Sequence, residues 1–263
     1  MILIVIAAGA LAAPLAPLPP PDRQDLARRL EGPSPGHPLG LDDLGRDVLS
    51  RVLWGARISL AVGLSVVLIA GTFGVAAGSV SGYLGGRVDA VLMALVDLLL
   101  GFPGVLLAIA LVAVLGPRLS NLILALCLIG WVGYARLARS LALGLRGSPF
   151  ADAARSAGCG PARVLLRHLL PNLLGPCLVQ AALGLGGAVL SEAGLSFLGL
   201  GVPAPAPSWG GMLRAGSQNL LEAPHLAIAP GVAIFAAVLG ANLIAEGMRQ
   251  RLDPRGGAQG TTL

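Results

Sequence analysis

Long apolar stretches alternate with short polar ones along the chain. Five of them, at about 58–83, 88–115, 119–138, 178–200 and 226–248, can each cross a bilayer, which takes about 20 helical residues. A shorter apolar stretch, 1–18, is interpreted as a first transmembrane helix whose lead-in is missing. The pattern therefore predicts an all-α membrane protein with about six transmembrane helices.

Arginine placement predicts which polar segments lie in the cytoplasm. Segment 19–57 holds as many arginines as acids, whereas 139–177, inside the five-helix core 58–248, holds five arginines against Asp152 alone. The tail 249–263 is also basic. Because arginine-rich segments stay in the cytoplasm, we expect both termini and 139–177 inside, and 19–57 outside.

Composition agrees with a membrane protein whose helices pack closely. Hydrophobic residues make up 55% of the chain and charged residues 12%, about half the charged share of a soluble domain. Small residues let helix backbones approach in lipid, and the chain has 38 glycines. Gly74, Gly78, Gly82 and Gly86 recur every fourth residue, which predicts a glycine ridge on one helix face.

Pro103 interrupts the third stretch within Gly101-Phe102-Pro103-Gly104. Proline removes a backbone donor and clashes with the preceding turn, so a kink is expected near the middle of this span. A kinked, glycine-flanked helix suits a gate or a pathway, and ordinary packing distortion is an open alternative.

Two carboxylates, Asp97 and Glu192, fall within predicted spans. A carboxylate in hydrocarbon is costly and usually faces a cavity or a partner. A hydrogen bond to another helix is the default expectation. The alternative is a proton relay, which would make the chain a stand-alone ion-coupled transporter.

Enzyme chemistry finds little support in the sequence. All 18 basic residues are arginine, which excludes a P-loop lysine and a Schiff-base lysine in this chain. The histidines form no metal-ligand pattern, and Cys127, Cys159 and Cys177 form no CxxC. Ser196 lacks the closing glycine of a nucleophile elbow, so an intramembrane hydrolase is only a weak alternative.

The polar segment 148–172 predicts a helix, a glycine turn and a second helix. Ser148 can cap the first helix, and Pro149 suits its first position. Asp152 complements the helix dipole, and Gly158 is a natural stop. The second helix is expected to end before Pro171.

The first of these helices carries a small apolar face, formed by Phe150, Ala153, Ala154 and Ala157. Such a face favours insertion into a groove of another protein. A basic loop without a partner is the simplest alternative. Nucleic-acid binding by a helix-turn-helix is disfavoured, because both ends are tethered to membrane helices.

At these residues the chain resembles a known family. Asp152-Ala153-Ala154, Gly158 and Leu170-Pro171 are similar to the "EAA" loop of bacterial ABC-importer permeases, in particular the C-type subunits of dipeptide, oligopeptide and nickel importers. Three further stretches carry the resemblance: HPLG through LGRDVLSR to GARISL (37–60), GW to YAR (130–136), and SEA through LSFLGLG to PSWG (191–210).

The resemblance implies a type I ABC importer permease fold, in which six helices form half of a heterodimeric pore in the bacterial inner membrane. The implied partners are a second permease subunit, two cytoplasmic ATPase subunits and an extracytoplasmic substrate-binding protein. ATP and Mg would be bound by the ATPases, so this chain would hold no cofactor and no metal. The cargo would be peptides or a related small solute such as nickel.

The resemblance also assigns an ATPase-docking element. It consists of Asp152, Ala153, Ala154 and Gly158, with Phe150, Arg155 and Pro161 as its flanks. Two positions depart from the family pattern: Asp152 stands where glutamate is usual, with a shorter reach, and Leu41 stands where threonine is common.

Overall fold

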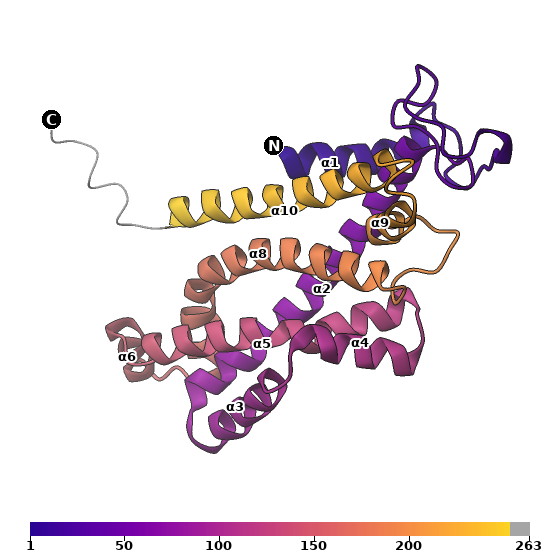
Figure 1. Cartoon of the computed structure of the whole chain (residues 1–263). Helices are drawn as coiled ribbons and strands as arrows, with labels where there is room; N and C mark the ends of the chain where they lie inside the picture. Colours follow the sequence, from indigo (N-terminus) through magenta and orange to yellow (C-terminus); the bar gives the residue numbers. More distant parts are fainter. Residues whose placement is uncertain (253–263) are drawn as a thin grey trace, which may run out of the picture. The chain divides into compact units, whose positions relative to one another are not determined.

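The computed structural model describes residues 1–252, so the end of the expected tail, 253–263, lies outside the described residues. The described chain is built from helices and loops, with two isolated β-bridges in its N-terminal loop (Figure 1). The elements are α1 (Ile2–Ala12), η1 (Ala13–Leu15), η2 (Leu26–Arg28), α2 (Val48–Leu84), α3 (Gly86–Leu100), α4 (Gly104–Leu115), α5 (Leu119–Leu145), α6 (Pro149–Ser156), α7 (Pro161–Arg163), the π-helical η3 (Val164–Leu169), α8 (Leu170–Phe197), α9 (Trp209–Gln218) and α10 (His225–Leu252).

Among residues 1–252, four helical segments are long and apolar enough to cross a membrane: Val48–Leu84, Leu119–Leu145, Pro161–Phe197 and His225–Leu252. A fifth span is broken, because α3 and α4 meet at an angle of 83°. The first apolar stretch forms only the short helix Ile2–Leu15. The prediction of an all-α membrane protein is confirmed. The expected count of about six spans is roughly matched by four or five spans and the short first helix.

The kink expected at Pro103 is a complete break between α3 and α4. The amide of Gly101 donates to the carbonyl of Asp97 at 3.0 Å and closes α3. Pro103 then cannot continue the helix, because it lacks an amide and keeps Phe102 out of the helical region. The break leaves residues 101–103 exposed in the middle of an apolar stretch.

The chain divides into two compact units, and several long helices contribute residues to both. The first unit comprises 1–65, 107–126 and 185–241. At its core lies the fully buried Trp209, whose Nε1 donates to the carbonyl of Val52 at 3.0 Å. Ala56, Val189 and Ala193 belong to the same apolar cluster.

The loop that precedes α2 is held by buried charges of the first unit. Asp42 accepts hydrogen bonds from the amides of Leu44 and Arg46, and Arg46 Nε also donates to it at 2.7 Å. Asp47 caps α2 by accepting from the amide of Ser50 at 2.7 Å. The helix therefore begins at Val48, ahead of the expected boundary near residue 58.

The second unit comprises 66–106, 127–184 and, within the described residues, 242–252. Its centre is the contact of α2 with α5, where the predicted glycine ridge lies. A β-carbon placed on Gly74, Gly78 or Gly82 would meet the carbonyl oxygen of Trp131, Ala135 or Arg139, respectively. Gly86 does not continue the ridge, since α2 ends at Leu84 and Gly86 begins α3 with a φ of +58°.

The second helix of the polar segment does not end before Pro171, so that prediction is wrong. The helical segment Pro161–Phe197 passes through Pro171 without a break. In its π-helical part, Val164–Leu169, the Leu170 amide donates to the carbonyl of Leu165, five residues back. Such wider turns relieve the strain that a proline imposes on a helix, and local sequence signals do not reveal them.

Candidate functional site

Within the polar segment 148–172, the short helix α6 has well-defined ends. Pro149 occupies its first turn, and the Ser148 carbonyl accepts from the amides of Ala151 and Asp152 at 3.0 Å each. The Ser148 hydroxyl does not cap the helix, as the sequence had suggested, but donates to the Leu145 carbonyl at 2.6 Å. It thereby ties α6 to the end of α5.

Gly158 ends α6 in a left-handed conformation, with a φ of +80°. Its amide donates to the Arg155 carbonyl at 2.9 Å, and the Cys159 amide donates to the Ala154 carbonyl at 3.0 Å. This pair of bonds is the Schellman arrangement, which favours glycine at the left-handed position. The predicted glycine stop is confirmed, and it turns the chain directly into α7.

One face of α6 is buried within the second unit. Ala151 and Ala154 are 0% and 9% exposed and pack in one cluster with Val164, Leu165 and Leu169. Tyr83 and Leu145, at the ends of α2 and α5, pack against the same cluster. Ala154, expected on the docking face, therefore helps to anchor α6 to the helices behind it.

The opposite face of α6 is open. Phe150, Asp152, Ala153 and Arg155 are exposed, as are Gly158 and Pro161 after the helix. Arg155 Nη2 donates to Asp152 Oδ1 at 2.5 Å and to the Arg146 carbonyl at 2.7 Å. This hydrogen bond to the Asp152 carboxylate raises the pKa of the Arg155 guanidinium, which keeps its charge. The structure thus places the seven sequence-predicted docking residues on one short element and its turn.

A tight ion pair joins α3 to α5 within the second unit. Arg139 donates to both carboxylate oxygens of Asp89, through Nε at 2.5 Å and Nη2 at 2.6 Å. Ser81, near the end of α2, donates to the same carboxylate at 2.6 Å. Bidentate arginine–carboxylate pairs are strong and geometrically specific, so this one fixes the turn between α2 and α3.

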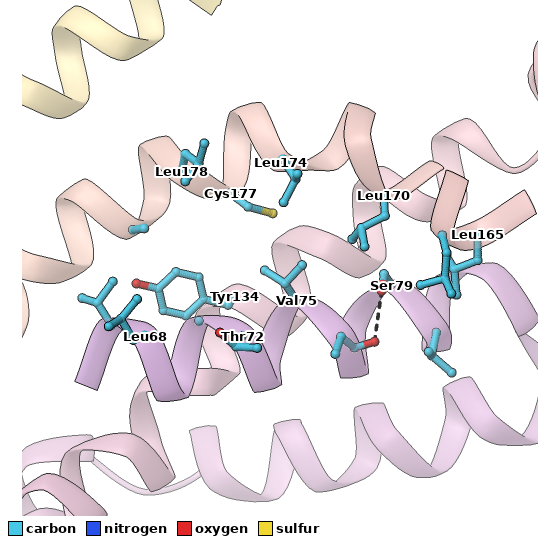
Figure 2. Close-up of a pocket in the computed structure, with 16 residues that line it drawn as sticks. Leu68, Thr72, Val75, Ser79, Tyr134, Leu165, Leu170, Leu174, Cys177 and Leu178 are labelled. Atoms are coloured by element: carbon cyan, nitrogen blue, oxygen red, sulfur yellow. Dashed lines mark hydrogen bonds between the residues drawn. The ribbon is translucent and has the colours of Figure 1, made fainter. Parts of the chain in front are cut away.

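An apolar groove of about 390 Å³ runs along the second unit, lined by α2, α5, η3 and α8 (Figure 2). Leu165 belongs both to the wall of this groove and to the cluster that holds α6. Figure 2 shows the ring of Tyr134 lying between Leu68 and Leu178. The hydroxyl of Tyr134 is buried and has no hydrogen-bond partner among the described residues.

The Tyr134 hydroxyl allows a direct test of the groove's packing. Tyr134→Phe is expected to raise the free energy of unfolding by about 1 kcal/mol, because an unpaired buried hydroxyl destabilises a fold. Gly184→Ala alone should lower the free energy of unfolding, because the β-carbon of the new alanine would collide with the Tyr134 hydroxyl. The double variant should recover most of the loss, since the ring carbon Cζ lies 3.3 Å from the new position. Thermal unfolding of the purified protein measures the stability of the two single variants and the double variant. If the stability change of the double variant equals the sum of the two single changes, this packing is contradicted.

The two carboxylates expected in the membrane belong to different units. Glu192 is fully buried in the first unit, where Ser59 donates to it at 2.8 Å and Ser196 at 2.7 Å. It therefore joins α8 to α2, the expected structural hydrogen bond to another helix. Asp97 lies on the second unit, exposed, with Arg136 Nη2 at 3.7 Å.

Comparison with known proteins decides the family. The sequence model described as "binding-protein-dependent transport system inner membrane component" matches residues 74–256. The chain belongs to this family. The match covers α6, the broken span and the part of the groove lining from Val75 onward, so these elements are those of a transport permease and not of an enzyme.

The relatives of this permease are similar over most of their length. A dipeptide transport system permease protein of Alkalihalophilus pseudofirmus is 44% identical over 87% of this chain and 75% of its own length. A glutathione transport system permease protein of Pectobacterium atrosepticum is 41% identical over 97% of this chain and 84% of its own. The resemblance to ABC-importer permeases is confirmed, and the ion-coupled alternative is disfavoured.

A solved structure shares the fold of this permease. A chain of the MetNI methionine ABC transporter, in an inward-facing form, has a TM-score of 0.56 at 19% identity, covering 74% of this chain and 94% of that one. The expected type I importer fold is confirmed. Permeases of this family are multi-pass inner-membrane proteins that work with an ATPase and a substrate-binding protein.

Several contacts of the permease were not predicted from its sequence. The ion pair of Asp89 with Arg139 joins residues 50 positions apart, and Arg136 lies 39 positions from Asp97. No spacing rule relates residues so far apart. A weak signal did exist, since Arg136 and Arg139 lie about one turn apart on one face of an apolar helix.

Proposed function

We propose that this permease subunit imports peptides as one half of a pore, paired with a second permease subunit. The names of two relatives, at 44% and 41% identity, refer to dipeptide and glutathione transport. Glutathione is itself a small peptide, so both names support a di- or oligopeptide cargo. Selectivity would be shared with an extracytoplasmic binding protein that delivers the peptide.

The coupling element of this proposal is α6 with its flanks, 148–172. Phe150 and Ala153 face outward for insertion into a groove of an ATPase, while Ala151 and Ala154 hold the helix to Leu165. Because Leu165 also lines the apolar groove, a displacement of α6 moves the groove wall directly. This packed connection from an exposed helix to the membrane helices is the observation that carries the proposal.

Energy for transport would come from two partner ATPases, which bind ATP and Mg²⁺. The basic residues around α6, among them Arg146, Arg155 and Arg163, favour a cytoplasmic position for this segment. Both termini then lie on the same side, and the 19–57 segment faces the binding protein. Each ATP-driven closure would push α6 and switch the pore between its two access states.

Copurification followed by reconstituted uptake tests the proposed function. A tagged chain, expressed with its genomic neighbours, should bring down a second permease and two ATPase subunits. In proteoliposomes, the purified complex should take up radiolabelled Ala-Ala only with ATP and the binding protein present. Uptake by this chain alone, driven by an ion gradient, would overturn the importer assignment. Uptake of nickel but not of Ala-Ala would overturn the peptide cargo.

A further inference from the structure

An exposed ion pair lies on the second unit, in an otherwise apolar part of the broken span. Asp97 stands between Val96 and Leu98 on α3, about 16 Å along the helix from Gly86. Arg136 of α5 approaches it, with Nη2 at 3.7 Å from Oδ1. The two side chains remain 65% and 58% exposed, although both lie on membrane helices.

The pair differs from its structural neighbour on the same two helices. Asp89 and Arg139 are joined by two short hydrogen bonds, and their side chains are only 17% and 32% exposed. Asp97 Oδ1 and Arg136 Nη2 are 3.7 Å apart, and both side chains leave most of their surface open. The Asp89–Arg139 pair holds α3 and α5 together, whereas the charged groups of the Asp97–Arg136 pair remain accessible to other molecules.

Lipid is an unsuitable environment for this face of the unit. Charged side chains inside membrane proteins face water-filled cavities or protein, because hydrocarbon leaves them unsolvated. The adjacent break adds a second, independent constraint. Residues 101–103 are exposed and non-helical, and the first amides of α4 have no partner within their own helix. Irregular backbone at membrane depth is tolerated only where protein or water satisfies it.

We infer that the Asp97–Arg136 face lines the water-filled translocation passage and contacts the charged ends of the transported peptide. This assignment rests on the proposed peptide cargo. A free peptide carries an α-ammonium and an α-carboxylate, and the pair offers one group of opposite charge to each. Asp97 accepts hydrogen bonds from the ammonium, and Arg136 donates a bidentate pair to the carboxylate. The long, exposed ion pair opens readily to receive them.

The lining role can be tested without any cargo, by cysteine accessibility in the complete importer. Cys127, Cys159 and Cys177 are first replaced by serine, and single cysteines are then placed at 97 or 136. Asp97→Cys and Arg136→Cys should react with a charged, membrane-impermeant methanethiosulfonate reagent. Val96→Cys is the matched control, because Val96 is 0% exposed in the core of the unit and should not react. If neither test position reacts in the assembled importer, lipid or a partner subunit covers this face and the inference is overturned.

The contact with the peptide is tested by uptake of radiolabelled Ala-Ala. Asp97→Asn and Arg136→Gln should each lower the uptake rate about tenfold or more, the usual effect of losing a charged hydrogen bond. The melting temperature of the complex should stay unchanged, whereas Asp89→Asn should lower it. Unchanged uptake in both Asp97→Asn and Arg136→Gln would overturn the peptide contact. A wild-type importer that takes up nickel but not Ala-Ala would instead overturn the proposed cargo, and the accessibility result would stand independently.

Discussion

Replacing Gly158 by arginine is expected to abolish ATP-driven uptake while the chain still inserts into the membrane. Gly158 has a φ of +80°, a conformation that costs an L-residue about 1–2 kcal/mol. The Schellman bonds to Ala154 and Arg155 depend on that conformation. Without them the end of α6 unwinds, and the added side chain projects from the proposed docking surface. Uptake, ATPase activity and membrane content of the importer should be measured together.

Gly160 provides a matched control two residues away. A β-carbon at Gly158 or at Gly160 would meet no atom within 4 Å, but Gly160 has an ordinary φ of −66°. Gly160→Arg should therefore keep substantial uptake, and Gly160→Ala should leave thermal stability unchanged. Gly158→Ala should lower stability by about 1 kcal/mol. Equal losses of uptake in the two arginine variants would show that bulk, and not the left-handed turn, controls coupling. Full uptake in Gly158→Arg would refute the coupling role itself.

The coupling segment was predictable because its signals are local. Pro149 at the first turn and Gly158 at a left-handed stop act on their own backbone, so the sequence alone places α6 correctly. The error at Pro171 has a local cause too. A proline is a sound reason to end a helix, but the π-helical turns before it shift the hydrogen bonds to the Leu165 carbonyl and let the helix continue.

The inward and outward faces of α6 were harder to assign. Helical spacing groups Ala154 with Phe150, Ala153 and Ala157, but it does not say which side meets the rest of the protein. Ala151 and Ala154 turn inward because Tyr83, Leu145 and Leu165 offer them apolar surface. Those neighbours come from three different helices, so only the folded structure determines the choice.

The partners in long-range polar contacts are likewise determined only by the folded structure. The sequence shows that Asp97 and Glu192 lie in apolar surroundings, and it predicts that each needs a partner. It does not show that Glu192 finds Ser59, 133 residues away, or that Asp97 finds Arg136. Burial then separates their roles, because Glu192 is fully enclosed and Asp97 is mostly exposed.

Replacing Gly78 by leucine is expected to prevent the second unit from assembling. A β-carbon at Gly78 would collide with the carbonyl oxygen of Ala135 and lie 2.8 Å from its Cα. These are backbone atoms in the middle of α5, so no side chain can rotate away. The same holds at Gly74 and Gly82, whose β-carbons would meet the carbonyls of Trp131 and Arg139. In lipid, helix association depends on such close packing, because burial of apolar surface adds little.

The expected loss for Gly78→Leu is about 3 kcal/mol or more, the upper range for overpacked sites. Since folded proteins have about 5–15 kcal/mol of stability, the variant should leave little complex in the membrane. Immunoblotting of membranes and thermal unfolding of any purified complex measure this loss. Gly144→Leu is the matched control, because Gly144 lies on α5 with no atom within 4 Å of a new β-carbon. It should keep normal amounts of complex, since leucine favours a helix by about 1 kcal/mol over glycine. If Gly78→Leu accumulates like wild type with an unchanged melting temperature, the α2–α5 contact is looser than described, and the ridge does not set the distance between these helices.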